Sequence, residues 1–259
     1  TARLRVVNRG DVPLRLLLRW QGAGEGEVRS EVATGVRDLR LDLRADWQSG
    51  EHRLEATARL GEEAVARSSR RLLVVRDARS GDAVTAYGFE IGKDRWNAPS
   101  WADGNQDGTG RTLQPEASSE TARGGSRSLR AEANLADGRF SQMFWLTPVG
   151  EDWSRFSKVR GWVFLPKGAP QGLLARVQMT GADWKYREFA ADVRLVPGEW
   201  TEVSADLTAS GAPSWNCTEG ELASALRWVV GFGFKVHNQG SGAGYRGPLY
   251  LDDVQLVLR

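Results

Sequence analysis

Two stretches of the chain, LLARVQMT at residues 173–180 and GFGFKVHN at residues 231–238, alternate between apolar side chains and other residues. Successive side chains of an extended strand point to opposite faces, so a period of two is typical of a β-strand with one face in a core. The other face carries glycines and polar groups: Arg176, Gln178, Gly231, Gly233, Lys235 and His237. Two interpretations stay open, a polar floor where glycines let a ligand approach the backbone, or an ordinary solvated face.

The same alternation recurs in short runs along the whole chain, separated by turn-forming clusters, and it predicts an all-β protein. Residues 1–78 hold strand-length runs about ten residues apart, which favour a small immunoglobulin- or fibronectin-like β-sandwich acting as a spacer. Residues 79–85 are small and polar and suit a linker. Residues 86–259 hold further strand-like runs, which predict a β-jelly-roll sandwich. One short helix is expected over 218–228, with Thr218 as its N-cap.

Tryptophan is abundant, and nine of the eleven tryptophans lie after residue 81. Trp101, Trp184 and Trp215 stand among turn formers without apolar periodicity, so each is either a ligand contact or a loop anchor. We expect Trp96 to cover the core. The remaining tryptophans of clear strand or helix patterns are expected in core packing: Trp145, Trp162, Trp200 and Trp228.

Several classes of protein are disfavoured by composition. The net charge of +2 without a basic block argues against nucleic-acid binding, and no apolar run is long enough to span a membrane. A single cysteine, Cys217, excludes an intramolecular disulfide, and two histidines 185 positions apart make a histidine metal centre improbable. No nucleophile elbow and no recognisable carboxylate pair is present, so independent catalysis is not expected.

Three motifs together resemble those of jelly-roll carbohydrate-binding modules. AYGFEIG at 86–92, ETARGGSRSLRAEA at 120–133 and GYRGPLYLDDVQLVL at 244–258 are similar to the opening, second and closing strands of such modules. Residues 137–166 resemble family-11 β-glucan-binding modules, whereas the RWNAPSW segment and the closing strand are similar to family-27 mannan-binding modules. The N-terminal part resembles the immunoglobulin-like spacers of multi-modular glycoside hydrolases.

The resemblance implies a set of carbohydrate-binding residues. It places Trp101 and Trp184 at aromatic platform positions. A third platform position falls near Arg139 and Phe140, where relatives have Trp or Tyr, and this departure leaves the polysaccharide open between β-mannan or glucomannan and β-glucan. The side chains expected to line a concave cleft are Arg176, Gln178, Tyr186, Lys235 and His237.

The same relatives carry a structural calcium ion that bridges the first and last strands. By resemblance, Glu90 and Asp252 are its carboxylate ligands, joined by carbonyl oxygens of the GGSRS turn. The ion would stabilise the fold and have no part in catalysis.

The sequence therefore predicts a non-catalytic module, cut from a longer secreted bacterial protein, that binds polysaccharide and targets an attached glycoside hydrolase. Its expected partners are a polysaccharide or oligosaccharide and the parent catalytic domain, with no nucleic acid and no membrane. Two alternatives stay open. One is a structural domain packed on a catalytic domain. The other is a jelly-roll polysaccharide-degrading enzyme, for which the densest supply of titrating groups is Lys185, Tyr186, Glu188 and His237.

Overall fold

The prediction of an all-β protein is confirmed by the computed structural model, which divides into two compact units, Thr1–Ala78 and Arg79–Arg259. The structure describes residues 2–8, 14–22, 26–32, 35–41, 50–60, 62–74, 78–147, 149–189, 192–208, 219–239 and 241–259. Trp215, Cys217 and Thr218, about which the sequence made predictions, lie outside these ranges. In the described ranges, no helix has the length and apolar character that a membrane span requires.

The first unit consists of antiparallel strands in two sheets. One sheet pairs β1 (Ala2–Asn8) with β4 (Gly35–Leu41). The other has the order β3 (Gly26–Val32), β2 (Leu14–Gly22), β5 (Gly50–Leu60) and β6 (Glu63–Val74). Apolar Leu16 of β2 is buried, while its neighbour Arg15 is exposed, as a period of two requires. The immunoglobulin-like topology of this unit stays a prediction.

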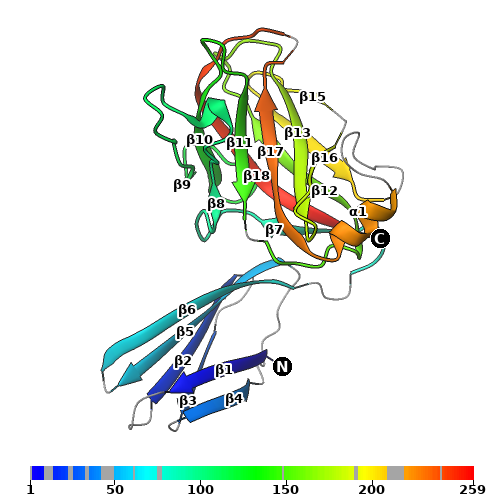
Figure 1. The fold of residues 1–259 in the computed structure, drawn as a ribbon. Coiled ribbons are helices and arrows are strands. Elements are labelled where there is room, and N and C mark those ends of the chain that lie inside the picture. The colour runs from blue at the N-terminus through cyan, green and yellow to red at the C-terminus, as the bar shows by residue number, and fades with distance from the viewer. Residues whose placement is uncertain are drawn as a thin grey trace. The chain divides into compact units, whose positions relative to one another are not determined.

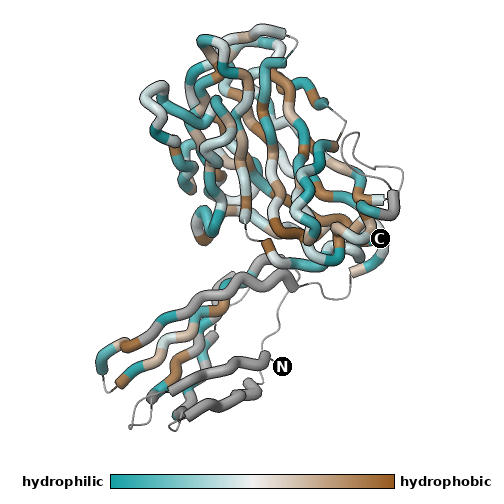
Figure 2. The backbone as a smooth tube through the Cα atoms, viewed as in Figure 1, coloured by the Kyte–Doolittle hydropathy of each residue, from teal (hydrophilic) through white to brown (hydrophobic). Residues whose placement is uncertain are grey.

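The second unit contains two antiparallel sheets of six strands each, one on each side of a shared core (Figure 1). The β12–β18 sheet contains β7 (Ala83–Tyr87), β9 (Glu116–Ser118), β10 (Ser128–Asn134), β12 (Phe156–Phe164), β16 (Trp200–Asp206) and β18 (Arg246–Leu258). The β13–β17 sheet contains β8 (Trp96–Asn97), β11 (Ser141–Leu146), β13 (Leu174–Gly181), β14 (Tyr186–Glu188), β15 (Val193–Arg194) and β17 (Val229–His237). Hydrophobic residues recur along these strands in Figure 2.

Aromatic side chains fill the space between the two sheets. Trp96 is 1% exposed, as predicted, and its ring makes edge contacts with Tyr87 and Phe232 at centroid distances of 5.4 and 5.3 Å. Phe234 reaches across to β12, where a Cβ on Gly161 would come within 2.7 Å of its ring. The core therefore accepts a phenylalanine from β17 only because β12 has a glycine at that position.

The single α-helix of the described residues, α1 (Glu219–Leu226), lies within the range predicted from the sequence. It packs against the end of β13, where a Cβ on Gly181 would lie 2.5 Å from that of Ala225. Trp228, predicted to be in the core, is instead 53% exposed, because the chain leaves α1 there and turns into β17. Its indole lies beside Gly150.

Candidate functional site

The outer face of the β13–β17 sheet brings together most of the side chains predicted to bind a ligand. The strand register places Arg176 of β13 opposite Lys235 of β17, and Lys235 opposite Met143 of β11. One step along the sheet, Gln178 lies opposite Gly233, which lies opposite Trp145. The alternation in residues 173–180 and 231–238 therefore predicted correctly which residues share this face.

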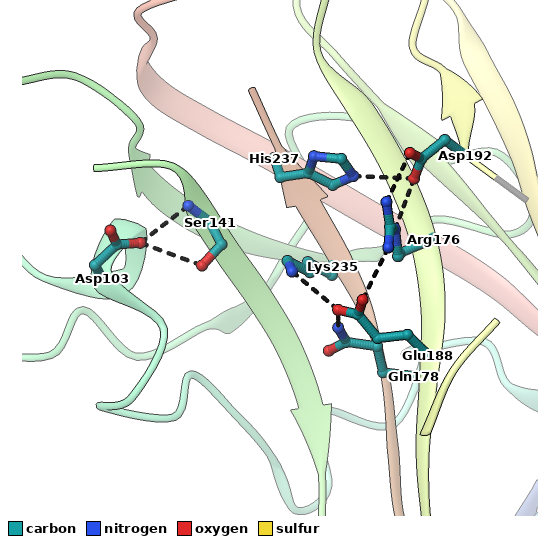
Figure 3. A network of polar contacts seen from close by, with 8 residues as sticks. All are labelled: Asp103, Ser141, Arg176, Gln178, Glu188, Asp192, Lys235 and His237. Carbon is teal, nitrogen blue, oxygen red and sulfur yellow. Dashed lines mark hydrogen bonds and ion pairs between the residues drawn. The ribbon is translucent and has the colours of Figure 1, made fainter. Parts of the chain in front are cut away.

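Polar side chains at one end of this face form a connected set that we call the polar network (Figure 3). Its members are Arg176, Gln178, Glu188, Asp192, Lys235 and His237. Glu188 is the centre of one half: Arg176 Nη1 donates to its Oε2 at 2.8 Å and Lys235 Nζ to its Oε1 at 3.0 Å. Gln178 Nε2 also donates to Glu188. The charged side chains of Arg176, Glu188 and Lys235 are only 15–20% exposed, so their neighbours hold them in a defined orientation at a partly open surface.

Asp192 is the centre of the other half of the network. Its two carboxylate oxygens accept from Arg176 Nε and Nη2, both at 2.6 Å, a bidentate pair. His237 Nε2 lies 3.0 Å from Asp192 Oδ1. Arg176 of β13 is thus shared between Glu188 of β14 and Asp192 beyond that strand, and the two carboxylates fix the orientation of its guanidinium.

The electrostatics of the network favour charged acids and a neutral histidine. Burial alone would raise the pKa of Glu188, but Lys235 and Arg176 outweigh it and hold this pKa below its ordinary value. The pKa of Asp192 is likewise lowered, since Arg176 and His237 outweigh its burial. Burial lowers the pKa of His237, helped by the positive charges of Arg176 and Lys235 and opposed by Asp192. None of these shifts moves a carboxylate pKa towards neutrality, as a general acid would need.

Aromatic side chains at the other end of the face form a second cluster, which we call the aromatic patch: Trp101, Trp145 and Tyr186. Trp101 is 58% exposed and makes edge contacts with Trp145 and Tyr186 at centroid distances of 5.9 and 5.8 Å. The rings of Trp145 and Tyr186 lie 6.2 Å apart. Burial raises the pKa of the Tyr186 phenol, so this group keeps its proton.

Glycines on this face do not leave open room for a ligand, as one of the two interpretations of the sequence required. A Cβ on Gly231 would lie 2.7 Å from Trp145 Cζ2, and one on Gly233 would lie 2.8 Å from Trp145 Cε3. The space over these glycines is therefore filled by Trp145, which is 7% exposed. Trp145 is buried as predicted, but it lies on the outer face of the sheet and supports the patch.

The loop that carries Trp101 is fixed along the edge of β11. The short 3₁₀ helix η1 (Asp103–Asn105) directs the Asp103 carboxylate at β11, where it accepts from the backbone N–H of Ser141 at 2.9 Å (Figure 3). Asn105 accepts from the backbone N–H of Met143 at 3.0 Å and donates to the carbonyl of Pro99 at 2.8 Å. The buried Asn105 accepts the hydrogen bond that a neighbouring strand would otherwise accept from β11 at this point. The loop is therefore held in place although its tryptophan is exposed.

The remaining predicted residues lie around this face. Trp184 is 75% exposed and stands in the turn that leads into β14, two residues before Tyr186. Phe140 is 51% exposed and directly precedes Ser141, which pairs with His237, so Arg139 and Phe140 lie at the polar end of β11. Gln178 and His237 are at most 1% exposed, which differs from the expectation that they line an open surface.

Three contributors were missed or misplaced by sequence reasoning. Asp192 lies after β14 outside any strand, so no periodicity marked it. Asp103 reads as an ordinary loop acid, and only the fold shows that its carboxylate accepts from the backbone N–H of Ser141. Glu188 had a detectable signal, because it alternates with Tyr186 in the YRE run, but it was considered only for the enzyme alternative.

Glu90 and Asp252, the predicted calcium ligands, both reach the glycine-rich turn 123–127. Glu90 accepts from the backbone N–H and hydroxyl of Ser126 at 3.0 and 2.7 Å. Asp252 Oδ2 accepts from the backbone N–H of Arg123 at 2.7 Å. Asp252 is fully buried, and burial raises its pKa to about 6. The free-energy cost of burying the charged carboxylate would be offset by a bound cation. In the part of the chain that the structure describes, no third carboxylate or histidine joins them, so an ion would take its other ligands from carbonyl oxygens or water.

Comparisons with known proteins give structural neighbours only. No protein-family model matches the sequence, and no curated protein matches it. The structural neighbours include a solved structure described as a study of carbohydrate-binding modules of the β-sandwich superfamily, with 11% identity over 99% of this chain and 98% of that one, at a TM-score of 0.44. A xylan-binding domain, CBM22-1 of Paenibacillus barcinonensis Xyn10C, shares 18% identity over 70% of this chain and 97% of that one, at a TM-score of 0.42. A family-11 module of a Clostridium thermocellum cellulosomal cellulase shares 10% identity over 66% and 92%, also at 0.42.

Proposed function

We propose that the second unit binds a β-linked polysaccharide on the outer face of the β13–β17 sheet and performs no catalysis there. The observation that supports this most is the placement of the aromatic patch, with its exposed Trp101, beside the polar network on one sheet face. A sugar ring has an apolar C–H face and a rim of hydroxyl groups. The first packs on an indole or phenol ring, and the second exchanges hydrogen bonds with charged side chains.

The residues divide into contact and support roles. Trp101, Trp184 and Tyr186 would stack on sugar rings, because the two tryptophans are exposed and Tyr186 lies in edge contact with Trp101. Arg176, Glu188 and Lys235 would offer donors and acceptors from the partly open part of the network. The buried Gln178 and His237 would keep those groups in orientation, and we place Arg139 and Phe140 at the far end of the same surface.

The particular ligand and setting belong to the same proposal. We infer β-mannan, glucomannan or β-glucan as the ligand, in a secreted bacterial protein where the module holds an attached glycoside hydrolase on its substrate. The paired charges of the network suit neutral hydroxyl groups better than acidic sugars, since each cation named there already has a carboxylate partner. The ionised state of Glu188 and Asp192 also disfavours the enzyme alternative.

Affinity electrophoresis tests the proposal. The chain is run through native gels that contain glucomannan, barley β-glucan, xylan or no polymer, and retardation by one polymer is expected. Trp101→Ala should abolish most of the retardation with little change in thermal stability, because the ring is largely exposed. Trp228→Ala is the matched control, since Trp228 is similarly exposed but lies beside Gly150. Equal migration in all gels, or release of sugars from any polymer, would refute the proposal.

We also propose that a calcium ion binds at Glu90 and Asp252 and stabilises the second unit. Binding to the folded state alone raises the melting temperature with added calcium and lowers it with chelator. Asp252→Asn should remove the response to calcium, because the amide cannot neutralise the ion. A wild-type melting temperature that is the same in calcium and in chelator would exclude the site.

A further inference from the structure

The turn between β13 and β14 holds Trp184 in an unusual conformation. The backbone of Trp184 has φ of +58°, in the left-handed region that residues other than glycine seldom adopt. Its backbone N–H donates to the carbonyl of Gly181 at 2.9 Å, and its indole is 75% exposed. An exposed side chain cannot by itself hold such a backbone, so other residues must fix the turn.

A buried arginine under the turn provides one fixed point. Arg187 of β14 is fully buried, and its guanidinium donates to both carboxylate oxygens of Asp183 at 2.9 and 2.6 Å. The same Nη1 donates to the carbonyl of Lys185 at 2.9 Å. Asp183 in turn accepts from the backbone N–H of Lys185 at 3.1 Å. Arg187 therefore contacts the residue on each side of Trp184.

Helix α1 provides a second fixed point. Lys185 Nζ lies 2.6 Å from Glu221 Oε1 of α1. Gly181, at the start of the turn, has Ala225 of the same helix where a side chain would be. Contacts with Arg187 and with α1 thus hold the turn in place, and the turn holds the indole of Trp184 at the surface.

We propose that Arg187 is a positioning residue for Trp184: through Asp183 it holds the turn so that the indole is oriented before a sugar ring arrives. This inference rests on the proposed function. Orientation before binding reduces the entropy lost on association, so it strengthens binding without a new contact. Arg187 is on the same short strand as Tyr186 and Glu188, whose side chains point to the opposite face, so β14 supports both the patch and the turn.

A double-mutant cycle on the polysaccharide found by electrophoresis tests the proposal. Trp184→Ala should weaken binding about tenfold, the range expected for one stacked aromatic ring. Arg187→Gln should weaken it by a similar factor in the otherwise wild-type chain and cause no further loss when Trp184 is already alanine. Arg160→Gln is the control, since that arginine pairs with Glu202 on the other sheet, and it should bind as wild type.

One further measurement and two further variants keep the outcome decisive. The near-ultraviolet circular dichroism contributed by Trp184, taken as the difference between variants with and without it, should be present in the wild type and lost with Arg187→Gln. If Arg187→Gln does not fold, Asp183→Asn is used, because Asp183 is 38% exposed and an amide of the same shape still accepts one hydrogen bond from Arg187. Arg187→Lys, which keeps the charge but loses the bidentate fork, should restore only part of both signals.

The outcomes separate this inference from the proposed function. A folded Arg187 variant with wild-type affinity and an unchanged difference spectrum would overturn the positioning role. A loss of affinity that persists in the Trp184→Ala background would also overturn it, because Arg187 would then act elsewhere. If no polymer retards the wild-type chain, the proposed function fails, and the difference spectrum alone still decides whether Arg187 orders Trp184.

Discussion

Gly233 lies where a side chain would clash both with the neighbouring strand β11 and with the ring of Trp145. An added Cβ would overlap the carbonyl oxygen of Phe144 and lie 2.8 Å from the Trp145 ring. Because both neighbours are buried, we expect Gly233→Ala to lower the free energy of unfolding by about 1–3 kcal/mol. Chemical denaturation measures this loss. Gly168→Ala, where nothing lies within 4 Å of the new atom, is the control and should change it by less than about 0.5 kcal/mol.

His237 links stability to pH through its burial, which lowers its pKa in the folded state. Above an unfolded pKa of about 6.5 both states hold a neutral ring, so the full stability is present. As the pH falls below that value, the unfolded chain binds a proton that the folded chain resists, and the free energy of unfolding decreases. Between about pH 7 and pH 5 the free energy of unfolding of the wild type should fall relative to that of His237→Gln, a comparison that cancels the opposite contribution of Asp252, whose pKa is raised to about 6. An equal slope in both proteins would contradict the assignment.

The polar network on and beside β13, β14 and β17 is balanced in charge, with Arg176 and Lys235 against Glu188 and Asp192. A ligand bound to it by hydroxyl groups displaces few counterions. We therefore expect the dissociation constant for the neutral polysaccharide to change less than about twofold between low and high salt, since screening mainly weakens interactions between net charges. Calorimetric titration at two salt concentrations measures this, and a steep fall in affinity would indicate an acidic ligand.

The alternation of β13 and β17 predicted which side chains share a face, but it did not predict what covers that face. A period of two gives two faces and does not say which contacts the core. Trp145 illustrates this, because a buried tryptophan satisfies the pattern on either side of β11. Asp192 and Asp103 were beyond such reasoning for another reason: their partners Arg176 and Ser141 are distant in sequence, and only the tertiary fold brings them together. The binding roles of the predicted residues stay predictions.

The motifs rich in tryptophan, and the sheet face that they build, lie in the second unit. The polar network, the aromatic patch and the turn of Trp184 all lie within Arg79–Arg259. The first unit has its own strand pairing, in two sheets that contain β1 to β6. Each unit thus has the internal pairing expected of an independent folding domain.

Separation of the two units tests this division. We expect residues 79–259, produced alone, to fold cooperatively and to bind the same polysaccharide within about twofold of the full chain, because a domain with its own core keeps its site geometry. Residues 1–78 alone should show no retardation in the same gels. Thermal unfolding followed by circular dichroism checks the fold of each piece, and calorimetric titration compares the affinities. A folded 79–259 fragment with strongly reduced affinity would show that the first unit contributes to the site, and the ligand contacts would then have to be sought on its strands as well.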